Sequence, residues 1–274
     1  MTAVPHTSRP ARPVDPALLS RALETAGRLA NDAAEVITAT LGQEHGRSVK
    51  ANPFDWVTDT DRTLERHTRR VLAADFPGCP VVGEEYGTGD DSRADADADA
   101  APLRWVVDPI DGTANYVAGL PWCAYSLALV DDDGPVVGVV ADPGRGQIYA
   151  AARGRGFRAN GAPVPAPRTT GPAGALVCAE DPEPGFLRRC RSAHAGVRVL
   201  GSAALAITQV ALGHAVAATL ERYHEWDVAG ALCLATEAGA LVLGRDGRAA
   251  AMPEGGMLVV APHAAAEVAA LWRG

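Results

Sequence analysis

Hydrophobic positions in the first half of the chain follow two different periods. From Asp15 to about Leu41 they recur every three or four residues, which is typical of one face of an α-helix, and the Asp-Pro pair at its start suits a helix N-terminus. A second helix is predicted from Thr58, a suitable N-cap, to about Asp75. Short apolar runs between turn residues predict strands at 81–82, 105–107, 123–130, 135–141 and 147–152. The strands that follow residue 122 are expected to be antiparallel, with a hairpin turn at Asp131–Gly134.

Strands and helices alternate in the second half. Strands are predicted at 175–179, 197–200, 216–220, 240–243 and 257–260, and helices at about 184–193, 202–212, 227–238 and 264–272. Such alternation is typical of an α/β sheet with mixed strands. Prolines and glycines between 163 and 172 indicate a linker. We therefore predict a disordered tail over residues 1–14, an N-terminal α+β domain over 15–172 and a C-terminal α/β domain over 173–274.

Composition narrows the classes of partner. The 274 residues are 47% hydrophobic and 21% charged, as in an ordinary globular protein. The net charge of −8 argues against nucleic acid or an anionic membrane as a partner. Five cysteines without a CxxC pair favour buried thiols in a reducing cytoplasm, and no stretch resembles a membrane span or a signal peptide. The alternating Asp and Ala residues at 95–100 lack the glycine and glutamate of a calcium loop, so a solvated loop is predicted there.

The most informative stretch runs from Trp105 to Trp122, and its centre reads Asp108-Pro109-Ile110-Asp111-Gly112-Thr113. The apolar run before it is predicted to be the end of a buried strand that delivers Asp108 to its edge, and the proline stiffens the turn. The carboxylates of Asp108 and Asp111 and the carbonyl of Ile110 then converge. Three hard oxygens on a rigid turn suit Mg²⁺. An ordinary Asx turn is the competing interpretation for the Asp-Pro pair alone.

Backbone amides beside this turn predict an anion site. Gly112 and Thr113 begin a short predicted helix, and N–H groups at a helix N-terminus bind phosphate. The stretch Gly201–Ala203 opens another predicted helix whose N–H groups could reach a substrate. In an acidic protein, a phosphate ester also needs bound cations, which the adjacent metal site would supply. The sequence therefore predicts metal ligands and a phosphate cradle side by side.

The hexapeptide resembles the DP(I/L)DGT signature of the inositol monophosphatase family, whose members are Mg²⁺-dependent, lithium-sensitive phosphomonoesterases. Three further stretches match family motifs in the expected order, namely Asp55–Asp61, Gly83–Glu85 and Trp226–Gly230. The resemblance extends over about residues 20 to 262. It implies a layered αβαβα sandwich of the inositol monophosphatase and fructose-1,6-bisphosphatase type. In that α/β (α+β) fold an antiparallel N-terminal sheet and a mixed C-terminal sheet flank the cleft that holds the metals.

The resemblance also implies metal ligands and catalytic groups. Two Mg²⁺ ions would be held by Glu84, Asp108, the Ile110 carbonyl, Asp111 and Asp227. A third ion would lie near Glu84 and Asp61. Glu84 and Thr113 would orient the attacking water and help to remove its proton, and Asp227 would assist the leaving group. The chemistry would therefore need no covalent phosphoenzyme.

The resemblance and the sequence also indicate residues that would support the metal ligands or contact the substrate. Asp55 and Glu85 would support the site, and Lys50 is either an active-site residue or a solvated lysine. Substrate contacts are predicted from Asp111, Gly112, Thr113, Ser202, Ala203, Glu221 and Asp227. The loop after Glu221 is one residue shorter than in the family, and His224 within it is either a substrate contact or a surface residue. The shorter loop leaves the identity of the substrate open.

Inositol monophosphate is the first substrate to expect. Histidinol phosphate, a 3′(2′),5′-bisphosphate nucleotide, fructose 1,6-bisphosphate and an aminocyclitol phosphate remain open, because related phosphatases share this metal core. A regulatory homologue that binds metal and phosphate without catalysis is the alternative from another class, but it would be expected to lose a carboxylate or the threonine, and all are present here. We therefore expect a cytoplasmic, homodimeric phosphatase that acts on a small phosphorylated polyol or similar ester, without nucleic-acid or membrane partners.

Overall fold

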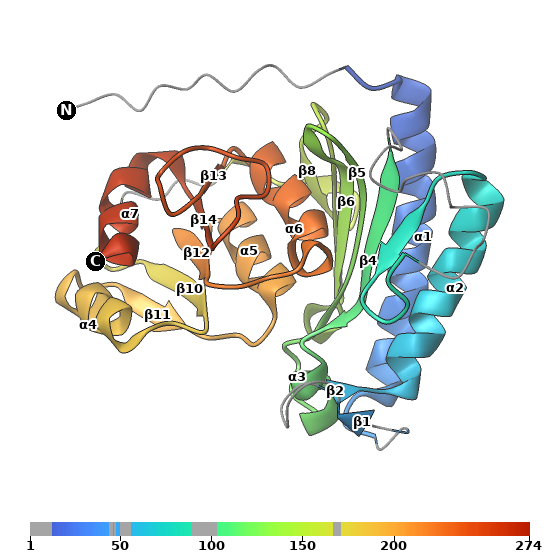
Figure 1. Ribbon diagram of the computed structural model, residues 1–274, viewed down its shortest axis with the longest axis horizontal. Helices are drawn as coiled ribbons and strands as arrows, with labels where there is room; N and C mark the ends of the chain where they lie inside the picture. Colours follow the sequence, from blue (N-terminus) through green and yellow to red (C-terminus); the bar gives the residue numbers. More distant parts are fainter. Residues whose placement is uncertain (1–12, 44–45, 47, 50–55, 89–102, 167–170) are drawn as a thin grey trace.

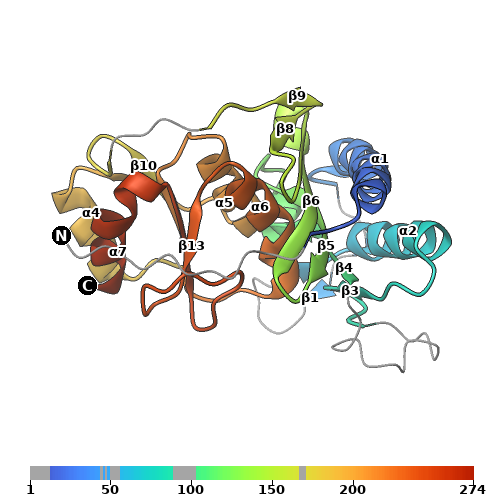
Figure 2. The ribbon, with the colours of Figure 1, turned by 90° about the horizontal axis from the view of Figure 1, so that it is seen from above.

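The computed structural model describes residues 13–43, 46, 48–49, 56–88, 103–166 and 171–274. Lys50 and Asp55, the predicted tail up to residue 12 and the predicted acidic loop from residue 89 to 102 lie outside the described residues. Within the described part of the chain, helices and sheets alternate in layers from one side of the molecule to the other (Figures 1 and 2).

Two long helices form the first layer. α1 (Pro16–Thr40) and α2 (Asp59–Asp75) lie side by side on one face of a seven-stranded sheet (Figure 1). On its other face lie α5 (Ala203–Ala211) and α6 (Glu225–Glu237), which separate it from a five-stranded sheet. α4 (Pro184–Ser192) and α7 (Ala265–Arg273) cover the far face of that second sheet. The predicted αβαβα sandwich is confirmed.

The seven-stranded sheet has the order β3-β4-β5-β6-β7-β8-β9. Its strands are β3 (Val81–Gly83), β4 (Arg104–Asp111), β5 (Ala124–Asp131), β6 (Gly134–Asp142), β7 (Gln147–Ala152), β8 (Phe157–Ala159) and β9 (Ala162–Pro163). All neighbours are antiparallel except β3 and β4, which run parallel. The parallel pair matters for function, because the ends of β3 and β4 carry the GEE and DPIDGT motifs to the same edge.

The five-stranded sheet has the order β11-β10-β12-β14-β13 and is mixed, as predicted. Its strands are β10 (Leu176–Glu180), β11 (Gly196–Arg198), β12 (Ala217–Leu220), β13 (Leu241–Leu243) and β14 (Met257–Val260). β10 is parallel to β11 and β12, whereas β14 is antiparallel to β12 and β13. Smaller elements are β1 (Ser48–Val49), β2 (Trp56–Val57), α3 (Thr113–Ala118), and the 3₁₀ turns η1 (Pro143–Arg145) and η2 (Pro262–Ala264).

Glycines let α6 lie directly on the seven-stranded sheet. A Cβ atom on Gly138 of β6 would lie 2.3 Å from the Gly230 carbonyl oxygen, and one on Gly230 would lie 2.5 Å from the Ser126 Oγ of β5. Such contacts are too short for a side chain, so both positions require glycine. The close approach sets the first turn of α6, which carries Asp227, against the strand that pairs with β4.

The change from one sheet to the other falls between Pro163 and Leu176, inside the stretch where the sequence indicates a linker. The division into two domains at residue 172 stays a prediction. In the part of the chain that the structure describes, every helix is too short or too polar to cross a bilayer.

Candidate active site

The DPIDGT turn closes β4. The strand runs to Asp111, four residues beyond its predicted end, because a bulge lies between Asp108 and Asp111 where the register to β5 shifts. Residues three apart on a regular strand point to opposite faces, and one extra residue at a bulge brings them to the same face. Asp108 Oδ1 accepts a hydrogen bond of 3.0 Å from the Ile110 N–H, so the Asx turn coexists with the converging carboxylates. The Thr113 hydroxyl donates to the Ile110 carbonyl oxygen at 2.9 Å.

Gly112 adopts a left-handed conformation with φ of 85° and begins α3. A Cβ atom there would lie 2.8 Å from the carbonyl oxygens of Gly201 and Trp122, so a glycine is required by its backbone angle and by its neighbours. The Asn115 side chain ties the same two segments together, donating to the carbonyls of Trp122 at 2.7 Å and Leu200 at 2.8 Å. The turn is therefore fixed against the segment that leads into α5.

Asp111 lies at the N-terminus of α5. Its carboxylate accepts hydrogen bonds from the Ser202 hydroxyl, from the Ala203 N–H at 3.2 Å and from the Ala204 N–H at 2.8 Å. Burial raises the pKa of Asp111 to about 8, although the Ser202 hydroxyl lowers it and the neighbouring Asp227 raises it again. The predicted substrate-binding segment 202–203 thus meets the DPIDGT turn, with the Asp111 carboxylate bonded to its amides.

Asp61 enters the site from the start of α2. Thr58 is the N-cap, as predicted, and its N–H donates to Asp61 Oδ2 at 2.9 Å while the Thr58 hydroxyl also bonds to that oxygen. The Thr113 hydroxyl lies 3.4 Å from Asp61 Oδ1. Burial raises the pKa of Asp61 to about 6, with Thr58 lowering it and the nearby Glu84 raising it. Asp61 is therefore adjacent to the two groups assigned to the attacking water.

Glu84 follows β3 in a turn that a buried glutamate holds in place. Glu65 of α2 is fully buried and accepts hydrogen bonds from the N–H groups of Glu85 at 2.8 Å and Tyr86 at 3.3 Å. Arg69 balances its charge at 2.8 Å. A Cβ atom on Gly83 would lie 2.2 Å from Glu65 Oε1, which explains the glycine of the GEE motif.

Sequence reasoning did not identify Glu65. The sequence feature that could have identified Glu65 is its position four residues after Asp61, because residues four apart share one face of a helix.

Asp227 is the third residue of α6. The helix begins at Glu225, the cap is His224, and the His224 N–H donates to Asp227 Oδ2 at 2.6 Å. The His224 ring accepts from the N–H at the third helical position and stacks on Trp226 with 4.7 Å between ring centroids. Glu225 pairs with Arg104 at 2.5 Å, which ties the start of α6 to the start of β4. The predicted helix start at Asp227 is thus two residues late, because His224 serves as the cap.

Carboxylates from three segments, namely the turn after β3, the end of β4 and the start of α6, gather at this edge of the seven-stranded sheet. Asp108 is 2% exposed, and burial raises its pKa well above the ordinary value, with Glu84, Asp111 and Asp227 raising it further. As they stand in the described residues, no three Asp, Glu, His or Cys side chains converge tightly enough to enclose a metal ion. The side-chain donors are all carboxylate oxygens, which Mg²⁺ prefers, and the burial of Asp108 and Asp111 disfavours their charged forms unless a cation is near, so the residues fit Mg²⁺. We call Glu84, Asp108, Asp111 and Asp227 the carboxylate cluster.

Glu221 is not brought to the carboxylate cluster. Its carboxylate accepts a hydrogen bond of 2.8 Å from the Trp272 indole N–H and pairs with Arg245. Trp272 belongs to α7, whereas Leu220, the residue before Glu221, packs against the α5 and α6 side of the sheet. Successive side chains on a strand point to opposite faces, which explains the orientation. Another acid, Glu180 at the end of β10, lies on the cluster side.

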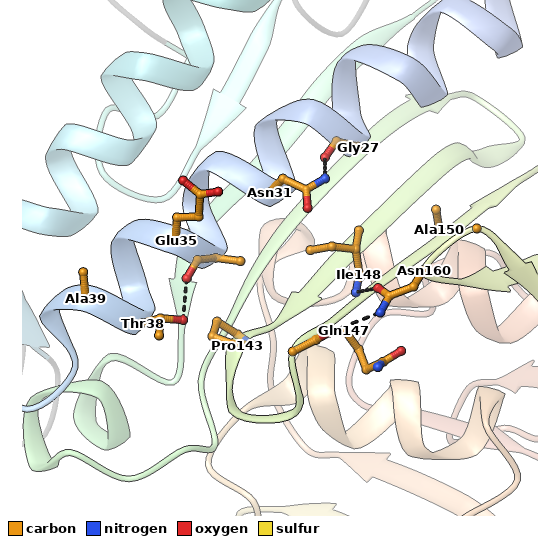
Figure 3. A pocket seen from close by; sticks show the side chains of 13 residues that line it. Gly27, Asn31, Glu35, Thr38, Ala39, Pro143, Gln147, Ile148, Ala150 and Asn160 are labelled. Atoms are coloured by element: carbon orange, nitrogen blue, oxygen red, sulfur yellow. Dashed lines mark hydrogen bonds between the residues drawn. The ribbon is translucent and has the colours of Figure 1, made fainter.

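A hollow of about 830 Å³ lies elsewhere, between α1 and the β7–β8 hairpin (Figure 3). Two of its amide side chains bond to nearby backbone groups. The Asn31 amide donates to the Gly27 carbonyl at 2.8 Å, and Asn160 accepts from the Ile148 N–H at 2.8 Å. None of the predicted catalytic residues lines this hollow, so the carboxylate cluster remains the candidate active site.

Comparisons with known proteins show the family to which the chain belongs. A model of the inositol monophosphatase family matches residues 18–273. Inositol-1-monophosphatase SuhB of Mycobacterium tuberculosis is 36% identical over 234 residues, which cover 77% of this chain and 75% of that protein. Inositol monophosphatase 1 of Bos taurus is 31% identical over 233 residues, covering 81% and 82%. A solved IMPase of Thermotoga maritima has a TM-score of 0.81 at 26% identity, covering 91% of this chain and 96% of its own. The chain therefore belongs to the inositol monophosphatase family, and it is a phosphoric monoester hydrolase.

Proposed function

We propose that this phosphatase hydrolyses a small phosphate monoester in an Mg²⁺-dependent reaction, with inositol monophosphate as its substrate. The observation that carries the proposal is the carboxylate cluster beside Thr113 and the start of α3. The names of the Mycobacterium and Bos relatives support the choice of substrate. An IMPase/NADP phosphatase of the same fold was solved with Mg²⁺ and phosphate, and a staphylococcal inositol monophosphatase-1 was solved as an inhibitory complex soaked in 100 mM LiCl.

The cluster would hold two Mg²⁺ ions through Glu84, Asp108, the Ile110 carbonyl, Asp111 and Asp227, with a third ion near Glu84 and Asp61. When bound, Mg²⁺ supplies positive charge that offsets the buried carboxylates and the phosphate, and it lowers the pKa of a coordinated water. This positive charge is what the acidic chain itself lacks, since its net charge is −8.

The remaining chemistry falls to groups of this chain. The Thr113 hydroxyl lies 3.4 Å from Asp61 Oδ1, so it can orient the attacking water and pass a proton toward that carboxylate or Glu84. Amides of Gly112 and Thr113 would donate hydrogen bonds to phosphate oxygens as the charge on these oxygens grows. Asp227 would hold the proton that the leaving alkoxide needs. The Ser202 hydroxyl and the Ala203 N–H bond to Asp111 and keep it oriented, and both residues would border the alcohol part of the ester.

A substrate panel tests the proposal. Phosphate release is measured with saturating Mg²⁺ from inositol monophosphate, histidinol phosphate, an adenosine 3′,5′-bisphosphate, fructose 1,6-bisphosphate and an aminocyclitol phosphate, each with an EDTA control. We expect the highest kcat/KM for inositol monophosphate and no turnover in EDTA. If another ester gives the highest kcat/KM, the choice of inositol monophosphate as the substrate is wrong. Turnover that is undiminished in EDTA contradicts the metal dependence.

We also propose a homodimer in the cytoplasm, with one domain over residues 15–172 and the other over 173–274. Leu120, Trp122 and Val199 are 49%, 40% and 59% exposed on two loops that Asn115 ties together, and a second copy of the chain would cover them. All five cysteines carry free thiols, which suits a reducing compartment. Light scattering on the purified protein tests the oligomer, with Val199→Asp expected to give monomers.

A further inference from the structure

Glu180 occupies the end of β10 at the edge that faces the carboxylate cluster. In the parallel pairing of β10 with β12 it lies beside Leu220, and paired residues of parallel strands point to the same face. Leu220 packs on the side of α5 and α6, so Glu180 points to that side as well. Glu180 is also close enough to Asp111 to raise the pKa of that carboxyl. The C-terminal sheet therefore contributes an acid at the active site.

The carboxylate of Glu180 can accept further hydrogen bonds. It accepts a hydrogen bond of 3.3 Å from the Leu200 N–H and lies near the Gly201 N–H. Among the residues that the structure describes, no Arg, Lys or His forms an ion pair with it, and its side chain is only partly covered. A half-buried carboxylate without an ion-pair partner costs free energy unless further donors reach it. Donors from a bound substrate would supply them.

The position of Glu180 determines which part of a bound substrate would contact its carboxylate. Leu200 and Gly201 lead directly into Ser202, which bonds to Asp111 at the metal site. A phosphate bound at the cluster would leave its alcohol part facing this segment. Glu221, the acid predicted for that role, is bound to α7 on the other face of the sheet. Glu180 is thus the acid that remains next to the alcohol part.

We propose that Glu180 is a specificity-determining residue that accepts hydrogen bonds from hydroxyl or ammonium groups on the alcohol part of the substrate. The inference rests on the proposed phosphatase reaction and narrows its substrate class to monoesters of polyols and amino alcohols. An ester with a second anionic group, such as a bisphosphate, would place negative charge beside the Glu180 carboxylate and is disfavoured by repulsion.

The test compares Glu180→Gln with wild type at pH 8.5 and saturating Mg²⁺. Burial raises the pKa of Glu180 to about 7, so the wild-type carboxylate is ionised at this pH. Four probes are used: inositol monophosphate, histidinol phosphate, fructose 1,6-bisphosphate and 4-nitrophenyl phosphate, whose alcohol part has no donor. Loss of a charge-assisted hydrogen bond is expected to lower kcat/KM for the first two by about 10- to 100-fold, mainly through KM. The aryl ester should change less than about 3-fold, and the bisphosphate should gain.

The aryl ester also separates recognition from structure. Glutamine still accepts from the Leu200 N–H, so the segment before Ser202 should keep its shape. If that segment moved, Asp111 would move with it, and kcat/KM would fall by the same factor for all four probes. That result would overturn the proposal. Unchanged ratios, or a wild-type preference for the bisphosphate, overturn it too.

Asp181→Asn is the matched control, because it removes the same charge one residue away. Asp181 is 73% exposed and pairs with the exposed Arg222, so its loss should leave every ratio unchanged. If Asp181→Asn shifts the ratios as much as Glu180→Gln does, general surface charge and not Glu180 sets the preference. If wild type releases no phosphate from any probe with Mg²⁺, the proposed function itself fails. If wild type is active and only the ratios stay fixed, the phosphatase proposal stands without Glu180.

Discussion

Asp61 is a buried carboxylate that should destabilise the protein whenever no metal is bound. It is 0% exposed, and it accepts hydrogen bonds from Thr58 and Thr113. Asp61→Asn keeps the size of the side chain and an oxygen that can accept from Thr58. It removes only the charge. We therefore expect metal-free Asp61→Asn to be more stable than metal-free wild type at pH 8, and far less active.

The magnitude follows from the pKa. Burial raises the pKa of Asp61 from 3.8 to about 6. Each unit corresponds to 1.36 kcal/mol, so ionising Asp61 in the folded protein costs about 3 kcal/mol. Because the folded pKa lies above the unfolded one, the cost is absent below about pH 4, grows between pH 4 and 6, and is complete above pH 6. The gain from Asp61→Asn should follow the same window and raise Tm at pH 8 by roughly 6–10 °C.

Thermal unfolding in EDTA at pH 4 and pH 8 measures this gain. Asp59→Asn is the control, because Asp59 lies in the same first turn of α2 but its side chain is 69% exposed. It should give no stabilisation at either pH. The reasoning is refuted if Asp61→Asn lowers Tm at pH 8, or if its effect is equal at both pH values. Full phosphatase activity of Asp61→Asn would contradict the catalytic role assigned to Asp61.

Three further changes test the site. Asp111→Asn should lower kcat at least ~100-fold with the fold intact, because a charge next to the metals is lost; phosphate release at saturating Mg²⁺ measures it, and activity within a few-fold of wild type contradicts the assignment. Lithium at millimolar concentration should inhibit without competing with substrate, and equal inhibition by sodium would point to ionic strength instead. Glu65→Gln should raise the Mg²⁺ concentration for half-maximal activity by about 10- to 100-fold, because Glu65 holds the turn that carries Glu84; an unchanged Mg²⁺ titration contradicts this positioning role.

Local patterns in the sequence predicted most helices and strands, because the hydrophobic periodicity that marks them depends only on residues close together in the chain. The long helix α1, the cap at Thr58 and the strands β5 to β7 fell within a few residues of their predicted bounds. The motif DPIDGT marked the turn, but the bulge that turns Asp108 and Asp111 to one face depends on the pairing of β4 with β5. Such pairing joins residues far apart in the chain, and a motif does not encode it locally.

The side-chain partners of the acids were not predictable for the same reason. Glu221 precedes the Trp-Asp motif closely, yet it bonds to Trp272 of α7, because the residue before it faces α5 and α6. Glu180 lies 47 positions before Asp227, yet the register of β10 and β12 directs it to the carboxylate cluster. Proximity in sequence therefore pointed to Glu221, whereas the strand register places Glu180, and not Glu221, on the side of the carboxylate cluster.

The glycines of the family motifs show how sequence and site are connected. Gly83 leaves room for the Glu65 carboxylate under the turn that carries Glu84. Gly230 leaves room for β5 under α6, one turn after Asp227. In both motifs a predicted metal ligand and a glycine lie within three residues, so the chain around the acid packs closely where its neighbour has no side chain. The close approach of like charges costs free energy, and the close packing at these glycines helps to hold the acids in place against that repulsion.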